Sequence, residues 1–506
     1  MHKLAQLDHR YVWHPFTQMR DWLRQEPITI VSGKGTVLRD VHGREYLDAN
    51  ASIWTNLHGH GHPTINAAIR RQLNKVAHSS ALGLANEPAS LLAQRLVDAA
   101  RLPAVTNGAK NAKQREHEFR IQPESEIRQP ELAKVFFSDD GSTAMEVALK
   151  LAYEFARRTG RSRRPRFLSL HGAYHGDTVG AVSLGHIDLF HAAYRSLLFR
   201  SDAVMAPYCY RCPFNRARPE RADAREYRRC RGECVDKVEQ RLATQRRKSE
   251  SYAGVVIEPL IQGAAGMIAQ PSGWLRQVAA LVRAHGALLI ADEILTGFGR
   301  TGAGGSGETS LFASHHEGVQ PDLMALAKGL SGGYLPLGAT LTSQALFDVF
   351  LGDYAEFKTF FHGHSFTANQ LGCAAALANL DLLDQPTSRR RRLTLEQMLR
   401  SLLPTLWGLP NVGDIRQVGL IAGIELVKNW RTREPFDLRD QAGIRVCQAM
   451  ARRGVLTRPI GNVVVILPPY CTTPAQLGKM VVALRAGIGD VFGRHASGKW
   501  TRTTST

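Results

Sequence analysis

Three polar segments of this 506-residue sequence each follow an apolar run, and their residue types could do chemistry together. The segments are Gly141-Ser142 after residues 134–138, Asp292-Glu293 after residues 288–291, and Lys328 after residues 322–327. Because parallel strands place their carboxyl ends at one edge of a sheet, we expect these side chains to lie close together.

The segment around Gly141 has the features of a phosphate-binding helix start. Gly141 lets a ligand approach the backbone, and Ser142 adds a hydroxyl beside the free N–H groups of a first helical turn. Thr143 and Glu146 form a T-x-x-E capping pattern. An ordinary capped helix has the same sequence, so both interpretations stay open. It is not a Walker loop, because no Gly-Lys-Ser/Thr follows at the required spacing.

The other two segments place an acid and an amine at the ends of strands. A carboxylate such as Asp292 can keep a cationic ring nitrogen protonated, although a single acid there is commonly satisfied by its own loop. A partly desolvated lysine has a lowered pKa and can form a Schiff base with an aldehyde, whereas a lone lysine after a strand is usually solvated. A phosphate cradle, a ring-nitrogen carboxylate and such a lysine together describe a pyridoxal phosphate site.

The same segments carry a family resemblance. Residues 292–300 (Asp-Glu-Ile-Leu-Thr-Gly-Phe-Gly-Arg) and residues 327–329 (Ala-Lys-Gly) resemble the signature of the class III (omega) aminotransferases, which depend on pyridoxal phosphate and have fold type I. The resemblance extends from Trp13 to about Phe492. It implies an α/β fold with a large, mostly parallel domain and a smaller α+β domain built from both chain ends. It also implies a homodimer.

Finer motifs are similar to the branch of this family that works in biotin synthesis. They are residues 13–17 (WHPFT), 54–60 (WTNLHGH), 172–178 (GAYHGDT), 361–366 (FHGHSF), 456–459 (LTRP) and 467–470 (LPPY). Members of that branch transfer an amino group to 8-amino-7-oxononanoate and make 7,8-diaminononanoate. The resemblance therefore implies an enzyme with small-molecule substrates.

The resemblance also implies which residues contact the cofactor. Lys328 would form the Schiff base and shuttle protons, Asp292 would pair with the pyridine nitrogen, and Tyr174 would stack on the ring. The cofactor phosphate would be bound by Gly141 and Ser142, and by His364 and Ser365 of the neighbouring subunit.

The residues implied at the substrate pocket include two departures from the usual pattern of the branch. Members that use S-adenosylmethionine as amino donor typically have tyrosine in place of Phe16 and two tryptophans in place of Ile53-Trp54. A smaller group that uses L-lysine resembles this chain at both positions. Both donors stay open, because the lost hydroxyl and indole ring remove contacts for a bulky sulfonium nucleoside. The implied pocket residues are Phe16, Ile53, Trp54, Tyr174, Gly363 and Arg458, with Arg458 binding the substrate carboxylate.

Two other function classes fit parts of the sequence. Another omega-aminotransferase, acting on ornithine, aminobutyrate or a diamine, would share the cofactor residues. A nucleic-acid-binding protein would use the net charge of +19, from 64 Lys and Arg against 45 Asp and Glu. The excess lies in arginine clusters at residues 157–166, 211–248 and 389–392, which are more typical of solvated faces. We expect no nucleic-acid partner.

Four cysteines have a spacing that a metal site could use. Cys209 and Cys212 form a C-x2-C pair, and Cys230 and Cys234 form a C-x3-C pair 17 residues later. Zinc ribbons allow this spacing, and the surrounding arginines predict lowered thiol pKa values. Structural metal, a redox-labile pair and no role all stay open, and our assignment is no metal.

The order of apolar and amphipathic segments predicts the elements and domains. Apolar runs rich in Val, Leu and Ile alternate with helical periodicity, which is typical of a mostly parallel α/β sheet. Expected strands are 134–138, 166–170, 254–258, 287–291 and 322–327, and expected helices are 64–76, 87–100, 143–158, 274–285 and one from about 371. Expected domains are 1–60 (small domain), 61–370 (cofactor-binding, with insertions at about 103–132 and 209–250), 371–492 (small domain) and a 493–506 tail.

The composition excludes several classes of protein. Apolar residues make up 44% and charged residues 22%, as in soluble globular proteins. No apolar run approaches the ~18 residues that span a bilayer, and residues 1–10 lack the apolar stretch of a secretory signal. Seven cysteines are too few for a disulfide scaffold. We expect a cytoplasmic protein with no membrane partner.

Overall fold

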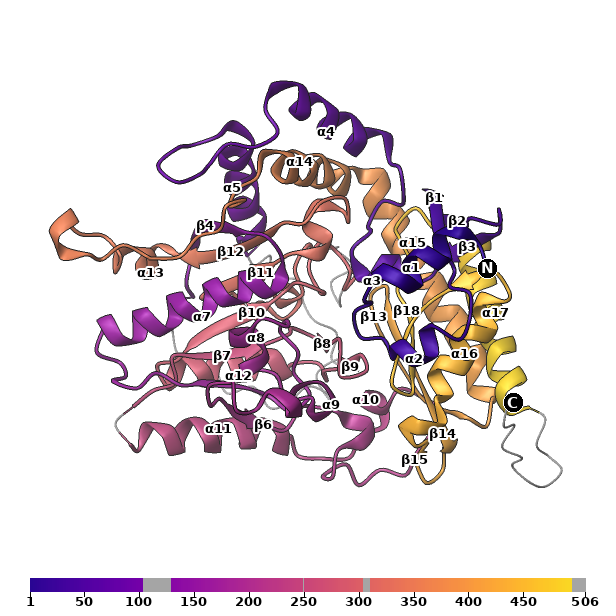
Figure 1. Cartoon of the computed structure of the whole chain (residues 1–506). Helices are drawn as coiled ribbons and strands as arrows, with labels where there is room; N and C mark the ends of the chain where they lie inside the picture. The colour runs from indigo at the N-terminus through magenta and orange to yellow at the C-terminus, as the bar shows by residue number, and fades with distance from the viewer. Residues whose placement is uncertain (103–128, 249, 304–309, 494–506) are drawn as a thin grey trace.

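A sheet of seven mostly parallel strands forms the centre of the molecule (Figure 1). The computed structural model describes residues 1–102, 129–248, 250–303 and 310–493. The strands are β4 (Leu132–Ser138), β5 (Phe167–Leu170), β6 (Asp202–Val204), β7 (Gly254–Ile257), β10 (Leu288–Asp292), β11 (Leu323–Leu326) and β12 (Gly338–Ser343). Their order is β4-β12-β11-β10-β7-β5-β6, and only β12 runs antiparallel to its neighbours. The predicted fold class is confirmed.

Helices cover both faces of this sheet, because alternate residues of each strand point to opposite faces. On one face, Leu288 and Ile290 of β10 pack in a cluster with α7 (Gly141–Arg158). On the other face, Leu289 packs in a cluster with α11 (Glu233–Arg246) and α12 (Trp274–Ala284). Burial on both faces explains why β10 is apolar throughout, apart from the aspartate at its end.

Both ends of the chain build a smaller body beside the central sheet. Near the N-terminus, β3 (Glu45–Asp48) pairs in parallel with β16 (Val455–Leu456), and Figure 1 shows the indigo and yellow elements together. The other strands are β1 (Ile30–Lys34), β2 (Val37–Asp40), β13 (Val412–Val418), β14 (Ile421–Asn429), β15 (Glu434–Pro435), β17 (Pro459–Ile460) and β18 (Val463–Ile466). The helices are α1 (Lys3–Tyr11), α2 (Met19–Trp22), α15 (Pro386–Leu402), α16 (Ala442–Ala451) and α17 (Pro474–Phe492).

The remaining elements connect or flank these two bodies. The helices are α3 (Ala51–Trp54), α4 (Pro63–Lys75), α5 (Glu87–Ala100), α8 (Val179–Ser183), α9 (Asp188–His191), α10 (Ala224–Tyr227), α13 (Gln344–Asp348) and α14 (Gln370–Asp384). A short hairpin of β8 (Ile261–Gln262) and β9 (Ile268–Ala269) follows β7. Between α13 and α14, residues 349–369 form an arm, part of which extends away from the body (Figure 1).

The predicted strands and helices are confirmed to within about two residues, but the strand series does not end at residue 327. β12 follows and lies between β11 and β4. Its sequence, Gly-Ala-Thr-Leu-Thr-Ser, mixes small and polar residues and gives no apolar signal, yet all six residues are buried.

The segments expected to be insertions correspond only in part to the prediction. Residues 103–128 lie outside the described residues, but Leu132 is 1% exposed and begins β4. In the second segment, α11 is the crossover helix between β6 and β7, and Val235, Val238 and Leu242 pack in the core. Their spacing is that of one helical face, so the second half of this segment belongs to the central domain.

The arginine clusters are less solvated than expected. Arg392 is 1% exposed, donates a hydrogen bond to the Leu383 carbonyl at 3.3 Å and lies over the Tyr470 ring. Arg211 bonds Glu425 through its Nε at 2.8 Å. These guanidinium groups contact a carbonyl, an aromatic ring and a carboxylate within the protein, so part of the positive charge is not available at the surface. The clusters therefore give little support to a nucleic-acid-binding surface. None of the helices in the described part of the chain has the length and apolarity that crossing a membrane requires.

The four cysteines are free thiols in the structure. Within the described ranges, no group of three or more His, Cys, Asp or Glu side chains is arranged to hold a metal ion. Burial raises the pKa of the Cys209 thiol to about 12 and also raises those of Cys212 and Cys234, so the prediction of lowered pKa values is wrong for these three thiols. Burial outweighs the nearby arginines here because the charged thiolate would lose its hydration.

Candidate active site

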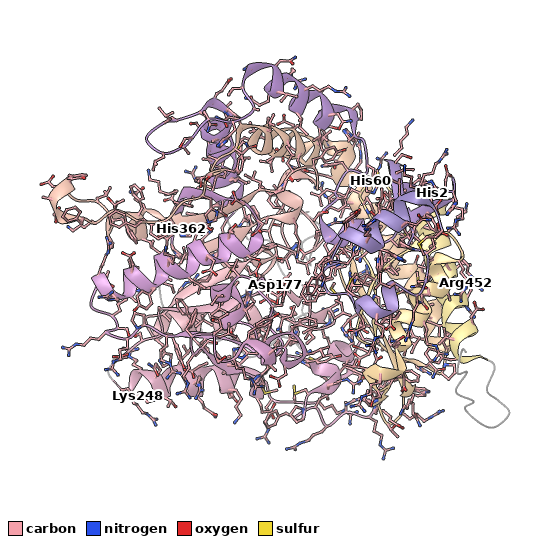
Figure 2. The ribbon with its side chains drawn as sticks, viewed as in Figure 1. His2, His60, Asp177, Lys248, His362 and Arg452 are labelled. Atoms are coloured by element: carbon pink, nitrogen blue, oxygen red, sulfur yellow. The ribbon has the colours of Figure 1, made fainter. Side chains whose placement is uncertain are left out.

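A cavity of about 450 Å³ lies at the carboxyl ends of the central strands. Its lining includes Gly141, Ser142, Tyr174, Asp292 and Lys328 from the large body and Trp54 from the segment that follows β3. Asp177, three residues after Tyr174, lies in the middle of the view in Figure 2, close to where the two bodies meet. The structure therefore brings together six of the residues that the sequence singled out.

The start of α7 forms one end of the cavity. Asp140 caps the helix by accepting the Thr143 N–H at 2.8 Å, and the Thr143 hydroxyl accepts the Asp140 N–H at 2.9 Å. The predicted capping pair of Thr143 and Glu146 is therefore wrong. Glu146 instead accepts the N–H groups of Gly180 and Ala181 and ties α7 to α8.

The loop after β5 lies directly on this helix start. The Ser142 hydroxyl accepts the Asp177 N–H at 3.2 Å. A Cβ on Gly176 would lie 2.2 Å from the Ser142 oxygen, and Gly176 has a φ of +128°. Only glycine lets the loop pass this close, so the backbone and the Ser142 hydroxyl form a tight polar cradle.

Asp292 ends β10 and is held in place by a buried histidine. Its Oδ2 lies 2.7 Å from Nδ1 of His175, and its Oδ1 accepts the Ile294 N–H at 3.1 Å. Burial lowers the pKa of His175, but the bond to Asp292 outweighs this effect and raises it overall. His175 therefore fixes the orientation of the Asp292 carboxylate at the end of β10.

Glu293, the next residue, is a structural acid. It is fully buried and accepts the N–H groups of Ala313 at 3.0 Å and Ser314 at 2.8 Å, together with the Thr296 hydroxyl. Its role is to hold Ala313 and Ser314 beside the end of β10. The pair Asp292-Glu293 thus contains one acid that lines the cavity and one that does not.

Lys328 follows β11, at the start of a short 3-10 helix, with its ammonium group in the cavity. Burial lowers its pKa, while Asp292 and Glu258 act in the opposite direction. Its Nζ lies 4.6 Å from the centre of the Trp54 ring. A lowered pKa increases the fraction of neutral amine, which is the nucleophilic form.

Glu258 is a second buried carboxyl group in the cavity. One oxygen accepts the Gly263 N–H at 2.8 Å, and the other has no hydrogen-bond partner. Burial raises its pKa to about 7, with His175 acting in the opposite direction. Neither Glu258 nor His175 was predicted from the sequence to be a site residue.

Aromatic residues form the rim of the cavity. The Tyr174 hydroxyl donates to Asp177 at 2.6 Å, and burial raises the pKa of Tyr174. Phe16 lies edge-on to Tyr174, with ring centres 6.5 Å apart, and to Phe190, at 5.2 Å. Arg458 donates from Nη2 to the Phe16 carbonyl at 2.7 Å. Phe16 and Arg458 therefore lie together at the rim, outside the cavity lining.

Ile53 and Trp54 lie on an unusual turn. The φ values of residues 51–54 are all positive, between 44° and 71°. This left-handed conformation costs roughly 1–2 kcal/mol per non-glycine residue. Trp54 points into the cavity, whereas Ile53 is 45% exposed and does not line it.

Three predicted residues lie apart from the cavity of their own chain. Nothing lies within 4 Å of a Cβ built on Gly363, and the His364 ring lies 2.8 Å from Asp139 of the same chain. The Ser365 carbonyl accepts a hydrogen bond from His78. None of the three lines the cavity.

The cavity has the features that an aldehyde cofactor with a phosphate group requires. The Ser142 hydroxyl and the helix start form an anion cradle that a Cβ at position 176 would fill. Asp292 can pair with a ring nitrogen, and Lys328 provides an amine of lowered pKa. The sequence model of the aminotransferase class-III family matches residues 19–488. The chain is a class III aminotransferase. Like the rest of this family, it depends on pyridoxal phosphate.

Relatives resemble this aminotransferase along almost its whole length. It is 45% identical to adenosylmethionine-8-amino-7-oxononanoate aminotransferase of Geobacter sulfurreducens, over 97% of this chain and 98% of the relative. It is 39% identical to the protein of that name from Aquifex aeolicus, over 96% and 97% of the two chains.

Solved structures of aminotransferases share the fold. The enzyme of the same name from Methanocaldococcus jannaschii superimposes with a TM-score of 0.82 at 35% identity, covering 97% of this chain and 99% of that one. A pyridoxal phosphate-bound amine transaminase from an uncultivated Pseudomonas species has a TM-score of 0.80 at 30% identity, covering 95% and 99%.

The residues that sequence analysis missed gave weak signals. His175 and Asp177 lie inside the motif at residues 172–178, but nothing in that motif states which side chain contacts Asp292. Glu258 immediately follows an apolar strand, as Asp292 does, so its position was a usable signal. Phe190 lies outside the motifs that the sequence singled out and gave no signal.

Proposed function

We propose that this aminotransferase transfers an amino group to 8-amino-7-oxononanoate and makes 7,8-diaminononanoate in biotin synthesis. The observation that carries the proposal is the position of Arg458 at the rim, in contact with Phe16, which packs on Tyr174. An acceptor with a long apolar chain and a terminal carboxylate could extend from Lys328 past these aromatic rings to the guanidinium. The names of the relatives support the same substrate.

The roles of the site residues follow from their surroundings. Pyridoxal phosphate, when bound, supplies an aldehyde carbon that accepts amino groups and a ring that takes up electrons. Gly141 and Ser142 would bind its phosphate, Tyr174 would cover its ring, and Asp292 would keep its ring nitrogen protonated. Lys328 would hold the aldehyde carbon of the cofactor and, when released, would accept and donate a proton at its Nζ. Trp54 would keep water away from that amine.

The amino donor is proposed to be S-adenosylmethionine, because the relatives' names include adenosylmethionine beside the acceptor. Two features of the rim favour L-lysine as a second candidate. Phe16 has no hydroxyl group, and the exposed side chain before Trp54 is Ile53 rather than a ring. Each missing contact is worth on the order of 1 kcal/mol to a bulky nucleoside. A lysine side chain needs neither contact.

The enzyme is further proposed to act as a homodimer in the cytoplasm. His364 and Ser365 lie between α13 and α14 and do not line the cavity of their own chain. A second copy of the chain would bring these residues to the phosphate of the neighbouring site, as the family resemblance implies.

A parallel assay tests the acceptor and the donor. The purified enzyme is offered 8-amino-7-oxononanoate with either S-adenosylmethionine or L-lysine, and 7,8-diaminononanoate is measured. Product with either donor supports the proposed acceptor. The double variant Phe16→Tyr, Ile53→Trp should raise turnover with adenosylmethionine and lower any turnover with lysine. No product with either donor, together with turnover of ornithine, aminobutyrate or a diamine, would assign a different omega-aminotransferase.

A further inference from the structure

The turn that carries Ile53 and Trp54 has a backbone conformation that ordinary side chains rarely adopt. Four consecutive residues without a glycine have positive φ, namely Ala51 (44°), Ser52 (48°), Ile53 (60°) and Trp54 (71°). In this conformation each Cβ crowds the following carbonyl oxygen, and the β-branched Ile53 is the least suited to it. Such strain persists only where the surroundings hold it, and it is found mainly at functional sites.

Asp48 holds this turn from the preceding strand. The carboxylate is 3% exposed and accepts the N–H groups of Asn50 at 3.2 Å and Ser52 at 3.1 Å. It also accepts the Ser52 hydroxyl at 2.9 Å and lies 3.1 Å from Nε2 of His60, which is labelled in Figure 2. Although burial acts in the opposite direction, these contacts lower the pKa of Asp48, so it stays ionised.

Other contacts join the turn to the loop that carries Lys328. A Cβ on Gly333 would lie 2.8 Å from the backbone of Asn56, so the chain after the turn packs directly on the chain after Lys328. Arg300, at the end of the signature segment, donates to the Asn56 carbonyl at 2.8 Å. Within the turn, the Trp54 indole N–H donates to the Asn50 side chain at 2.8 Å.

The result is a fixed position for the Trp54 ring. Its centre lies 4.6 Å from Lys328 Nζ, and the ring lines the cavity, with Ile53 exposed next to it. A right-handed turn at residues 51–54 would point both side chains elsewhere. The contacts of Asp48 with the turn therefore fix which side chain, Trp54, lies beside Lys328 in the cavity.

We propose that Asp48 is a positioning residue for the substrate pocket: its carboxylate holds the left-handed turn that places Trp54 over Lys328. Asp48 acts through the turn and contacts neither the cofactor nor the substrates. The inference rests on the proposed function only in treating Trp54 as a wall of the pocket, and it applies to whichever donor and acceptor the wild-type enzyme uses.

The test compares Asp48→Ala with Asp40→Ala in the purified holoenzyme. Asp40 is a matched control because it lies on β2 of the same sheet and is 1% exposed. It also receives four hydrogen bonds, from the N–H groups of His42 and Arg44, from Arg44 Nε and from the Tyr46 hydroxyl. Both variants should lose stability. Only Asp48→Ala should raise KM for both substrates, by about tenfold with a smaller change in kcat, and speed hydrogen exchange at residues 49–57.

A second substitution distinguishes a role of Asp48 in positioning the turn from a role in overall stability alone. Glycine adopts the left-handed conformation without penalty, so Asp48→Ala, Ser52→Gly should recover a large part of the lost KM. If Asp48→Ala does not fold, Asp48→Asn replaces it, with a smaller expected rise in KM. Equal KM changes in the Asp40 and Asp48 variants, or no recovery with glycine, would overturn the inference. Absence of turnover with the proposed substrates in the wild type would instead refute the proposed function, while the exchange measurement still tests Asp48.

Discussion

Asp292 and Glu293 are adjacent in the sequence, yet their surroundings give them different tasks. Both acids have hydrogen-bond partners at both oxygens, but only Asp292 lines the cavity. A buried acid with satisfied oxygens away from any cavity contributes to stability. An acid whose oriented carboxylate lines a cavity is available for chemistry.

Substitution of Asp292 should therefore lower the catalytic rate, whereas substitution of Glu293 should lower the stability of the fold. Asp292→Asn should lower kcat by well over tenfold, about 1.4 kcal/mol in barrier, at nearly unchanged stability, because the amide holds the ring nitrogen protonated less well. Glu293→Gln should cost about 1–3 kcal/mol of stability, because it weakens the buried hydrogen bonds to Ala313 and Ser314. Steady-state rates and thermal unfolding of both variants check this. A loss below tenfold for Asp292→Asn would contradict the assigned role.

Glu258 makes stability depend on pH. Its pKa is raised by burial to about 7, above the 4.5 of an exposed glutamate. The folded protein therefore holds this proton more tightly than the unfolded chain, and stability is lost as pH rises from about 4.5 to 7. Because glutamine stays neutral, Glu258→Gln should stabilise the protein at pH 8 by up to about 3 kcal/mol and by less at pH 5.5.

Thermal unfolding of Glu258→Gln at both pH values measures this difference. Glu87→Gln is the control, because Glu87 is exposed and pairs with Lys75 on the surface. It should change stability equally little at pH 5.5 and pH 8. A Glu258→Gln variant that is no more stable at pH 8 than at pH 5.5, relative to the wild type, would mean that Glu258 stays ionised in the folded protein.

At the scale of single residues, the sequence predicts the groups that end strands and misses those that support them. Lys328, Asp292 and Ser142 could be placed because apolar runs precede them and because parallel strands have their carboxyl ends at the same edge of the sheet. His175 reaches Asp292 from a loop 117 residues earlier, a contact that only the folded chain creates. Arg458 and Phe16 lie 442 residues apart in sequence and meet at the rim for the same reason.

At the scale of elements, the start of α7 and the loop after β5 form one unit. Gly176→Ala would place a methyl group 2.2 Å from the Ser142 hydroxyl and displace it from the helix start. We expect the dissociation constant of pyridoxal phosphate to rise by about tenfold or more, with the fold retained. Titration of the cofactor-free enzyme, followed by absorbance, measures it.

Gly172→Ala is a matched control for this substitution. Gly172 lies in the same loop and also has a positive φ, +77°, but its Cβ would meet Ala265 and not Ser142. It should also carry the backbone strain of a non-glycine residue at positive φ, without the loss of cofactor affinity. Equal effects of both substitutions would mean that strain in the loop, and not the position of Ser142, controls binding.

The elements themselves were predictable where burial gives a simple pattern. β10 and β11 are apolar because helices cover both faces of the sheet, and α5 was predicted at its observed bounds, Glu87–Ala100. β12 was missed because small and polar residues suffice where the neighbouring helices pack closely. The left-handed turn at residues 51–54 was missed because no local pattern predicts strain that distant contacts hold.

At the scale of the whole molecule, the arm after α13 exposes an unusual number of aromatic side chains. Tyr354 is 91% exposed, Phe357 64%, Phe361 68% and Phe366 59%. Clustered exposed rings commonly mark interaction surfaces, and the same arm carries His364 and Ser365. We therefore expect the arm to form part of the proposed dimer interface and to complete the neighbouring site.

The double variant Tyr354→Lys, Phe357→Lys should weaken this dimer, because burying two ammonium groups at an interface costs far more than burying two rings gains. Sedimentation should then show a larger monomer fraction, and the cofactor should bind more weakly in proportion, because the monomer lacks the second copy's phosphate contacts. Leu189→Lys is the control, since Leu189 is 73% exposed but lies on α9, away from the arm. A variant that stays dimeric would exclude these residues from the interface. A monomer that keeps the wild-type cofactor affinity would show that each chain binds the phosphate alone.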